Sequence, residues 1–495
     1  MQKSIILLLL FVGGSVFTQS QPLEIQWQQC YGSSDNDFAN DMVLYDNHYY
    51  IVGSTNAADG DVSSLHGGDD IWLIKTDTLG HLIWEKTFGG SGYDAGYGIS
   101  RSGKDLIIAG TSGSTDGDVE DSPYEASNIW VIKVDTSGRL LWEKMLGGNY
   151  RDEVIRSTGT YDGGVIVVGN TASDDGDVSN YFYLWDGWVV KLDSTGAIEW
   201  DYTIGSTMSH DFSQAVIQTS DSGFLVGSAS QVLGQTNIKC DPYENTSEAI
   251  LFKFDKHGEV EWQRCYGGSN SEGVFELIET PDGYLFTSHG GSDDGDCEGC
   301  GYHSPGYPKP SGDIWLVKTD FQGNIQWHKC YGGTEPEAVK KMFRIERTNG
   351  YILFGSTRSS TEYGPNGDVS DNPSISQYNP SLWVIQIDST GELLYERCIG
   401  GEGEDWMRYA VVQKNWYTYM VAGMSTWGPS HDVACDIYDE HENFWLFEIR
   451  DKSVGMPEIA EPESKLKAYP NPAVRQVAFT YTLARSIKQG TLEIR

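Results

Sequence analysis

The sequence predicts an all-β protein, a seven-bladed β-propeller of four-stranded antiparallel blades that is closed by the N-terminal strand. Three observations lead to this fold. The 495-residue chain is rich in turn and strand formers, with 58 Gly, 28 Tyr, 17 Phe and 16 Trp. A tryptophan-containing unit recurs about every 60 residues, as expected for a propeller or solenoid. The two ends of this repeat array are incomplete, and each supplies what the other lacks.

Each unit contains two tryptophan-containing strands. The first, strand c, follows W-h-h-K-x-D, where h is apolar, at Trp72, Trp130, Trp188, Phe252, Trp315, Trp383 and Trp445. The second, strand d, follows I/L-x-W-x-x-x-x-G at Trp27, Trp84, Trp142, Trp200, Trp262 and Trp327, with Tyr395 in the last copy. Turns such as D-T-S-G join c to d, because Asp can bond its own turn and Gly supplies positive φ. Two short runs before strand c, such as "GYGISRSG" and "DLIIAG", provide strands a and b. We expect the repeated tryptophans to pack within and between blades.

The ends of the array determine how the ring closes. The first d strand, at 25–30, has no c strand before it, and the seventh c strand, at 444–450, has no d strand after it. We therefore predict that residues 25–31 form the outer strand of the last blade, because an open array would leave two unpaired edges. A linear solenoid would need capping units, which the sequence does not show.

The eight cysteines follow the repeat. Four lie three residues after the Trp or Tyr of strand d: Cys30, Cys265, Cys330 and Cys398. The other four lie in loops between strands b and c: Cys240, Cys297, Cys300 and Cys435. This arrangement predicts disulfides between Cys240 and Cys265, between Cys297 or Cys300 and Cys330, and between Cys435 and Cys30, with Cys398 bonded to the cysteine left in the fifth loop. The C-x-x-C at Cys297 is alternatively typical of a zinc or redox pair.

The N-terminus predicts export. Residues 1–20 read as a secretory signal peptide, with Lys3, an apolar stretch from Ile5 to Val16, and small residues before a cleavage site at Gln21. No later apolar run approaches the length of a membrane-spanning helix. We expect a secreted protein, extracellular or on the outer-membrane surface, in a compartment that permits disulfides.

Two resemblances add to this reading. The units, stated most fully in "YDGGVIVVGNTASDDGDV" (161–178), resemble a secreted bacterial β-propeller repeat family from about Gln26 to Arg450. This implies a propeller domain at 21–450, followed by an acidic linker at 451–465. "YPNPA" (469–473) resembles the opening of the C-terminal sorting domain of the type IX secretion system. That resemblance implies a truncated β-sandwich sorting domain at 466–495 and the type IX machinery as a partner.

Charge and loop length narrow the function. The formal net charge of −37, from 71 Asp and Glu against 34 Lys and Arg, disfavours nucleic acids and anionic membranes as partners. The strand order places the d to a and b to c connections on one face, here called the loop face, and the short a to b and c to d turns on the other, the turn face. Because the b to c loops are long, we expect binding on the loop face.

Two sets of acidic residues belong to the loop face. The D-G-D pattern can direct two carboxylates at one Ca²⁺, which makes these residues candidate calcium ligands: Asp59, Asp61, Asp116, Asp118, Asp175, Asp177, Asp294, Asp296 and, after Asn366, Asp368. The alternative is that they bond their own turns. A second set follows each glycine pair and either bonds the local turn or forms an axial ligand site: Asp37, Asp94, Asp152, Asp211, Glu272, Glu337 and Asp405.

No catalytic motif identifies an enzyme, since H-E-x-x-H, G-x-S-x-G and nucleotide-binding glycine loops are all absent from the sequence. The c to d turn is similar to the tryptophan motif of pyrroloquinoline quinone dehydrogenases, but those enzymes usually have a pair of adjacent cysteines, which this chain lacks. The turn is also similar to the sialidase Asp-box, but it has one extra residue between Asp and Gly. We therefore predict a non-enzymatic module that binds a protein or glycan, with a two-carboxylate glycosidase as the alternative. Exposed aromatic residues outside the repeat would suit such contacts: Trp185, Trp406, Trp416, Trp427, Tyr302, Tyr307 and Tyr363.

Overall fold

A computed structural model describes most of the chain between residues 23 and 452, together with residues 467–469 and 478–480. The gaps within 23–452 are 121–122, 125, 241–245, 301–302, 304–311, 362–365, 375–378, 409, 427–428 and 436–440. The predicted signal peptide, the linker from residue 453 and most of the predicted sorting domain lie outside the described residues. Two short strands there, β30 (Lys467–Tyr469) and β31 (Ala478–Thr480), pair antiparallel.

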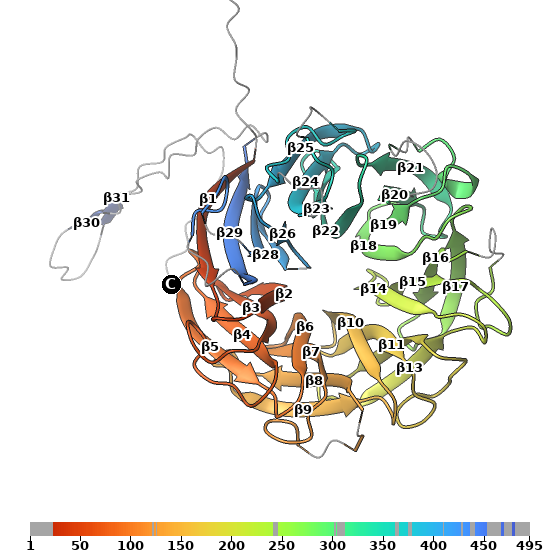
Figure 1. Cartoon of the computed structure of the whole chain (residues 1–495), viewed down its shortest axis with the longest axis horizontal. Coiled ribbons are helices and arrows are strands. Elements are labelled where there is room, and N and C mark those ends of the chain that lie inside the picture. The colour runs from red at the N-terminus through yellow and green to blue at the C-terminus, as the bar shows by residue number, and fades with distance from the viewer. Residues whose placement is uncertain are drawn as a thin grey trace, which may run out of the picture. The chain divides into compact units, whose positions relative to one another are not determined.

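One compact unit, residues 25–450, is a ring of seven antiparallel sheets around a common axis (Figure 1). In each blade the strands follow one another from the axis outward. Blade 1 contains β2 (Asp37–Tyr45), β3 (His48–Thr55), β4 (Asp70–Thr76) and β5 (Leu82–Phe88). Blade 2 contains β6 (Asp94–Ser102), β7 (Asp105–Ser112), β8 (Asn128–Val134) and β9 (Leu140–Leu146). Blade 3 contains β10 (Asp152–Gly159), β11 (Val165–Thr171), β12 (Asp186–Leu192) and β13 (Ile198–Ile204).

The remaining blades follow the same order. Blade 4 contains β14 (Phe212–Gln218), β15 (Phe224–Ser230), β16 (Glu248–Phe254) and β17 (Val260–Tyr266). Blade 5 contains β18 (Val274–Thr280), β19 (Gly283–Gly290), the short 3-10 helix η1 (Gly295–Cys297), β20 (Asp313–Thr319) and β21 (Ile325–Tyr331). Blade 6 contains β22 (Glu337–Ile345), β23 (Gly350–Thr357), β24 (Ser381–Ile387) and β25 (Leu393–Ile399). Blade 7 contains β26 (Asp405–Trp406), β27 (Val411–Asn415), β28 (Thr418–Ser425), β29 (Asn443–Asp451) and β1 (Leu23–Tyr31).

The ring closes as the sequence predicts, because the N-terminal strand β1 lies beside β29 as the outer strand of blade 7. The Trp445 indole donates to Gln28 Oε1 at 2.8 Å, and the Ala434 amide donates to the same oxygen at 2.9 Å. A disulfide between Cys30 and Cys435 joins the same two segments. Blade 7 departs from the other six in its innermost strand, where β26 and β27 pair separately with β28.

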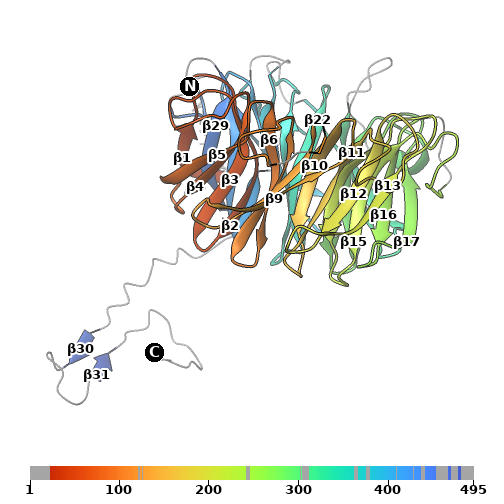
Figure 2. The same cartoon turned by 90° about the horizontal axis from the view of Figure 1, so that it is seen from below.

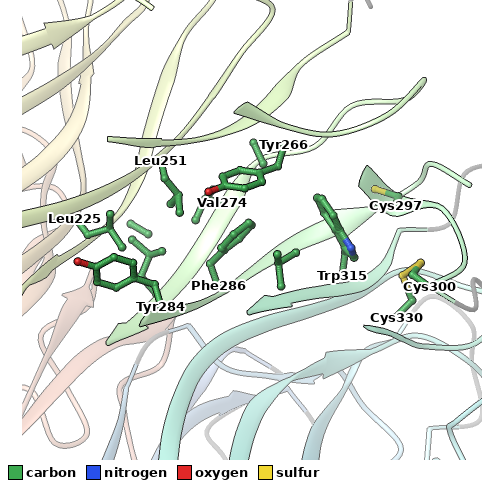
Figure 3. Close-up of a cluster of buried hydrophobic side chains, with 14 residues drawn as sticks. Leu225, Leu251, Tyr266, Val274, Tyr284, Phe286, Cys297, Cys300, Trp315 and Cys330 are labelled. Carbon is green, nitrogen blue, oxygen red and sulfur yellow. A yellow bond between two sulfur atoms is a disulfide. The ribbon is translucent and has the colours of Figure 1, made fainter. Parts of the chain in front are cut away.

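Burial in the core of a blade explains why tryptophan recurs in strand c. Trp72, Trp130, Trp188, Trp315, Trp383 and Trp445 are at most 1% exposed. Their indoles donate to the residue that follows the strand d aromatic, as Trp130 does to Glu143 Oε2 at 2.7 Å. Six blades thus bury an indole while satisfying its N–H group, and blade 4 buries Phe252 at the same position. Figure 3 shows Trp315 within such a core, beside Phe286 and Tyr266.

Contact between neighbouring blades explains why tryptophan recurs in strand d and glycine recurs in the c to d turn. Gly138, in the c to d turn of blade 2, has φ of +81°, a conformation that other residues rarely adopt. A Cβ atom there would lie 3.1 Å from the ring of Trp84 in blade 1. Asp135 fixes the turn, because its Oδ1 accepts from the Ser137 and Arg139 amides. The repeat therefore encodes a contact between neighbouring blades as well as the turn itself.

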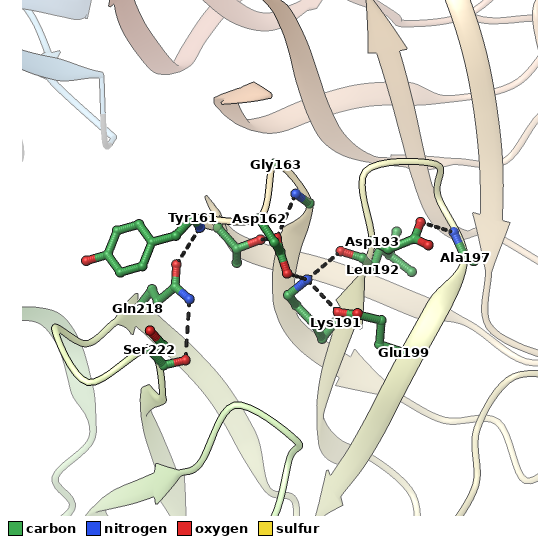
Figure 4. Close-up of polar contacts among 12 residues, drawn as sticks. Tyr161, Asp162, Gly163, Lys191, Leu192, Asp193, Ala197, Glu199, Gln218 and Ser222 are labelled. Carbon is green, nitrogen blue, oxygen red and sulfur yellow. Dashed lines mark hydrogen bonds and ion pairs between the residues drawn. The ribbon is translucent and has the colours of Figure 1, made fainter. Parts of the chain in front are cut away.

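The lysine of the W-h-h-K-x-D pattern is also structural. Lys191 on β12 is buried, and its Nζ lies 3.0 Å from Asp162 in the a to b turn and 2.7 Å from Glu199 on β13 (Figure 4). Burial alone would raise the pKa of Asp162, but hydrogen bonds from Thr160 and Gly164 and the nearby ammonium together hold it below its usual range. This ion pair ties three strands together at the turn face.

Three of the predicted disulfides are confirmed: Cys30–Cys435, Cys240–Cys265 and Cys300–Cys330. The prediction that Cys398 bonds to the remaining fifth-blade cysteine is wrong, because Cys297 and Cys398 are both free and buried. They lie in separate hydrophobic clusters, Cys297 with Trp315 and Cys398 with Trp383. The b to c loop of blade 6, which would have to supply a partner to Cys398, contains no cysteine.

No helix within the described residues combines the length and apolar character needed to cross a membrane.

Candidate functional site on the loop face

The strands run between two faces, and Figure 2 shows the propeller from the side. The d to a and b to c connections emerge together on the loop face, since hydrogen bonds join them in each of the first three blades. In blade 2 the amide of Asp118, in the b to c loop, donates to the carbonyl of Gly89, in the d to a connection, at 2.8 Å. The d to a and b to c connections therefore lie on the same face, as the sequence predicts.

The D-G-D residues act as clasps between these two connections. In blade 2, Asp116 Oδ1 accepts from the Ser91 amide at 2.6 Å, and Asp118 Oδ2 accepts from the Gly89 amide at 3.3 Å. The same pair of bonds recurs in the other copies, through Asp59 and Asp61, Asp175 and Asp177, Asp294 and Asp296, and Asn366 and Asp368.

These hydrogen bonds give the D-G-D residues a local role. Each carboxylate binds a backbone amide of a glycine-pair turn, and the two members of a pair bind different amides. Within the described ranges, no three acidic, histidine or cysteine side chains are grouped so that they could hold a metal ion. Calcium binding by these loops stays a prediction.

The acids after the glycine pairs are buried in their own turns. All seven are at most 3% exposed: Asp37, Asp94, Asp152, Asp211, Glu272, Glu337 and Asp405. Glu337 shows the pattern, since Oε2 accepts from the Gly333 amide at 3.2 Å and Oε1 accepts from Thr357 Oγ1 at 2.8 Å and Ser359 Oγ at 2.6 Å. The amide contact corresponds to the local alternative, in which the carboxylates organise their own turns, and the hydroxyl contacts also tie this turn to the end of β23.

A second buried acid faces several of these carboxylates. At the junction of blades 1 and 2, a Cβ atom on Gly89 would lie 2.6 Å from Asp70 Oδ1 and 2.7 Å from Asp94 Oδ2. Glycine is therefore required here by the close approach of two carboxylates. The equivalent pair of Glu248 and Glu272 flanks Gly267.

Burial raises the pKa values of carboxyls in these pairs. Loss of solvation, with smaller contributions from neighbouring carboxylates, raises the pKa of Asp186, Glu272 and Glu337 to about 7 each. Two like charges at short separation in a poorly solvated site cannot both ionise at low cost. Asp186, Glu272 and Glu337 therefore bind protons at a higher pH than ordinary carboxyls do.

Two histidines that the sequence reading missed bridge neighbouring blades. His66 Nδ1 lies 2.8 Å from Asp70 Oδ2, and its Nε2 lies 3.6 Å from Asp118 Oδ2 in the next blade. His303 repeats this geometry between Asp313, at 3.0 Å, and Asp368, at 3.7 Å. The two histidines stand at different offsets from the following strand c, so no common spacing in the sequence relates them.

Strand a of six blades carries a β-bulge at the same height. The residue after the bulge is charged in four of these blades: Asp41, Arg156, Glu276 and Lys341. Arg156 Nη2 forms an ion pair with Glu276 and donates to the Lys340 carbonyl at 3.3 Å, so this side chain reaches from blade 3 to blades 5 and 6. Bulges re-aim side chains, and here they place an ion-pair network within the ring of inner strands.

A cavity of about 370 Å³ lies on the turn-face side of this network. Its walls come from the later residues of the innermost strands, including Asp41, Lys341, Phe343 and Gln413.

A second cavity, of about 310 Å³, lies on the loop-face side, between blades 5, 6 and 7. We call it the mouth cavity and define it by six of its lining residues: His289, Glu337, Lys340, Arg358, Glu404 and Trp406. It lies where β26 and β27 are interrupted. Arg408, in this interruption, places its guanidinium 5.6 Å from the centre of the Trp406 ring and 5.8 Å from that of Tyr97.

Exposed aromatic residues gather on the loop-face connections of blade 3. Tyr150 is 58% exposed in the connection from β9 to β10, and Tyr181 and Tyr183 are 37% and 47% exposed in the connection from β11 to β12. We call these three residues the tyrosine patch. Asp186 supports it, because Oδ2 accepts from the amides of Phe182 and Tyr183.

The structure separates the aromatic residues that the sequence singled out. Trp185 and Trp406 are half-buried on the loop face, whereas Trp416 is 64% exposed on the turn face. Trp427, Tyr302, Tyr307 and Tyr363 lie outside the described residues. The tyrosine patch was missed because its members lie in non-repeating loop sequence.

Comparisons with known proteins found similarity to solved structures only. No protein-family model matches the sequence, and no curated protein matches it. Similar solved structures include a protein of unknown function from Bacteroides caccae, with 12% identity, a TM-score of 0.34, and coverage of 71% of this chain and 93% of that chain. A quinohemoprotein alcohol dehydrogenase from Pseudomonas putida has 10% identity and a TM-score of 0.36, with coverage of 90% of this chain and 78% of that chain. YCF48 bound to a D1 peptide has 9% identity and a TM-score of 0.42, with coverage of 87% of this chain and 97% of that chain.

Proposed function

We propose that this protein is a secreted or cell-surface binding module without enzymatic activity, which takes an extracellular glycan or protein on its loop face. The tyrosine patch carries this proposal. Tyrosine offers a large apolar surface and a polar tip at low conformational cost, which suits both sugar rings and protein surfaces. Three exposed tyrosines on the connections of one rigid blade form a prepared contact surface.

The proposed extracellular or cell-surface location is supported by the sequence and by the disulfides. Residues 1–20 have the pattern of a signal peptide, and "YPNPA" at 469–473 resembles a type IX sorting signal. The three disulfides are compatible with an oxidising compartment. We propose the type IX machinery as the export partner, and cell fractionation with and without residues 466–495 tests this role.

A glycan array and a panel of purified extracellular proteins, probed with the full chain, test the binding function. We expect a ligand whose affinity falls at least about tenfold in the double variant Tyr150→Ala/Tyr183→Ala, because two large contact surfaces are removed. Tyr161→Ala is the matched control, since Tyr161 is 72% exposed on the turn face. Equal losses in the two variants would contradict a loop-face site.

One observation favours the glycan-active enzyme as a second candidate. Two carboxylates, Glu337 and Glu404, line the mouth cavity, and burial raises the pKa of Glu337 to about 7, as a general acid requires. However, Glu337 also performs the turn-holding role shared by the six equivalent acids. Assays for release of reducing sugar from the array ligands, with Glu404→Gln as the variant, distinguish the two candidates.

A further inference from the structure

The mouth cavity combines an aromatic side chain with positive charge in a strongly acidic protein. Trp406 forms part of its wall, and Lys340 and Arg358 come from blade 6. Arg358 is exposed, and no described carboxylate forms an ion pair with its guanidinium. In a protein with a net charge of −37, Arg358 thus places a positive charge beside a cavity, where it can meet an anionic ligand.

The acids of the cavity do not cancel this charge. Both carboxylate oxygens of Glu337 already accept hydrogen bonds, Oε2 from the Gly333 amide in its own turn and Oε1 from hydroxyls at the end of β23, and burial raises the pKa of this group to about 7. Glu404 is exposed at the rim. His289 adds a neutral ring, because burial and the neighbouring Lys340 lower its pKa to about 4. The cavity therefore presents the guanidinium of Arg358, the basic residue Lys340, a neutral imidazole and an indole, with the carboxylate of Glu404 at its rim.

We propose that the mouth cavity binds a single carboxylate-bearing sugar residue, such as a uronic acid, at the end of a glycan chain. The carboxylate lies beside Arg358 and Lys340, and an apolar face of the sugar ring packs on Trp406. A guanidinium matches a carboxylate through two parallel hydrogen bonds, and aromatic rings bind the C–H face of sugars. The inference rests on the proposed binding function and names the ligand class at one point of the loop face.

The walls favour a sugar over an acidic peptide. An extended peptide is usually held through main-chain hydrogen bonds at a strand edge. Pro336 and Pro380 line this cavity, have no amide hydrogen, and have carbonyls that already accept from Arg358 and Asp405 amides. The volume of about 310 Å³ is at the lower end of the range for ligand pockets, which suits one or two sugar rings.

The charge of the whole protein limits the ligand to one acidic group. A polyanion would meet repulsion from the acidic surface on either side of the cavity, whereas one carboxylate in an otherwise neutral chain meets mainly the local cations. We therefore expect a glycan with a terminal uronic acid to bind better than either its neutral counterpart or a sulfated polysaccharide.

Isothermal titration calorimetry of the full chain tests this inference. The probes are a neutral trisaccharide, the same trisaccharide with a terminal glucuronic acid, heparin, and a tetrapeptide of aspartate and glycine. We expect binding of the glucuronylated probe, no measurable binding of the others, and a loss of about tenfold in Arg358→Gln and in Trp406→Ala. Arg347→Gln, on the turn face of the same blade, is the control for removing one positive charge.

Two results would overturn the inference. One is a loss of specificity or of dependence on the arginine: equal affinity for the neutral and glucuronylated probes shows the first, and equal affinity of the wild type and Arg358→Gln shows the second. The other result is preferential binding of the peptide. The proposed function is judged by a separate result. If an array ligand binds, its affinity depends on Tyr150 and Tyr183, and Arg358→Gln leaves that affinity unchanged, then the binding function stands while the acidic-sugar site does not. Circular dichroism of each variant confirms that the propeller remains folded.

Discussion

The disulfide between Cys30 and Cys435 offers a quantitative test of ring closure. It joins residues 405 apart in the sequence, whereas Cys240 and Cys265 are only 25 apart within blade 4. In the chain-entropy model the longer cross-link restricts the unfolded chain by about 6 kcal/mol and the shorter one by about 3.5 kcal/mol. All four cysteines are half-buried, so their packing losses are comparable.

The perturbation is the double variant Cys30→Ala/Cys435→Ala, compared with Cys240→Ala/Cys265→Ala. We expect the first to lose about 2.5 kcal/mol more unfolding free energy than the second, in urea unfolding without reductant. We also expect faster hydrogen exchange in β1, since that strand then keeps its ladder, the Gln28 contacts and the Glu24–Lys452 ion pair but loses its covalent link to the loop before β29.

The comparison can fail clearly. If the Cys30 and Cys435 variant loses no more free energy than the blade 4 variant, then closing the longer loop carries no additional stabilisation, and the chain-entropy reasoning is wrong for this ring. If β1 exchanges no faster, the disulfide is not what keeps the ring closed.

Three further predictions concern the pH, the turns and the loops. The unfolding free energy should fall as pH rises from about 4 to about 7. The reason is that Glu272 and Glu337, with pKa values of about 7 in the folded state, keep protons that the unfolded carboxyls release near pH 4. Urea midpoints across this pH range test the sign, and Glu272→Gln should make the unfolding free energy less dependent on pH. Gly138→Ala should cost about 1 to 3 kcal/mol more than Gly103→Ala, since both glycines have positive φ but only Gly138 faces a neighbouring blade; equal costs would remove the inter-blade contact from the explanation. If the D-G-D loops bind Ca²⁺, the melting temperature should rise with added Ca²⁺ and fall with chelator, and an unchanged midpoint would remove calcium.

Much of the fold could be predicted because each unit encodes its own strands locally. Alternating apolar residues, the D-T-S-G turn and the buried tryptophan act within one hairpin, and repetition makes this weak signal readable. The closure of the ring could also be predicted, because the missing strand at one end matches the surplus strand at the other. The Cys398 pairing failed because the sequence rule assumed a partner that the loop of blade 6 does not supply.

The candidate site was only partly predictable. The sequence identified the loop face and both acidic sets, but it could not show that D-G-D carboxylates bind amides of the d to a connections or that Glu337 bonds both its own turn and the end of β23. Which oxygen meets which amide depends on how two loops far apart in the chain fold over one another. The two histidine bridges were missed for the same reason.

The sequence by itself determined the seven units, their strand order, the closing strand and three of the disulfides, because short-range periodicity and turn chemistry specify these features. Only the tertiary structure decided the mouth cavity. His289 and Arg358 lie at the loop-face ends of strand b in blades 5 and 6, and Trp406 lies in the interrupted inner strand of blade 7. They meet because the ring brings the inner edges of blades 5, 6 and 7 together, and because the interrupted inner strand of blade 7 leaves room between them.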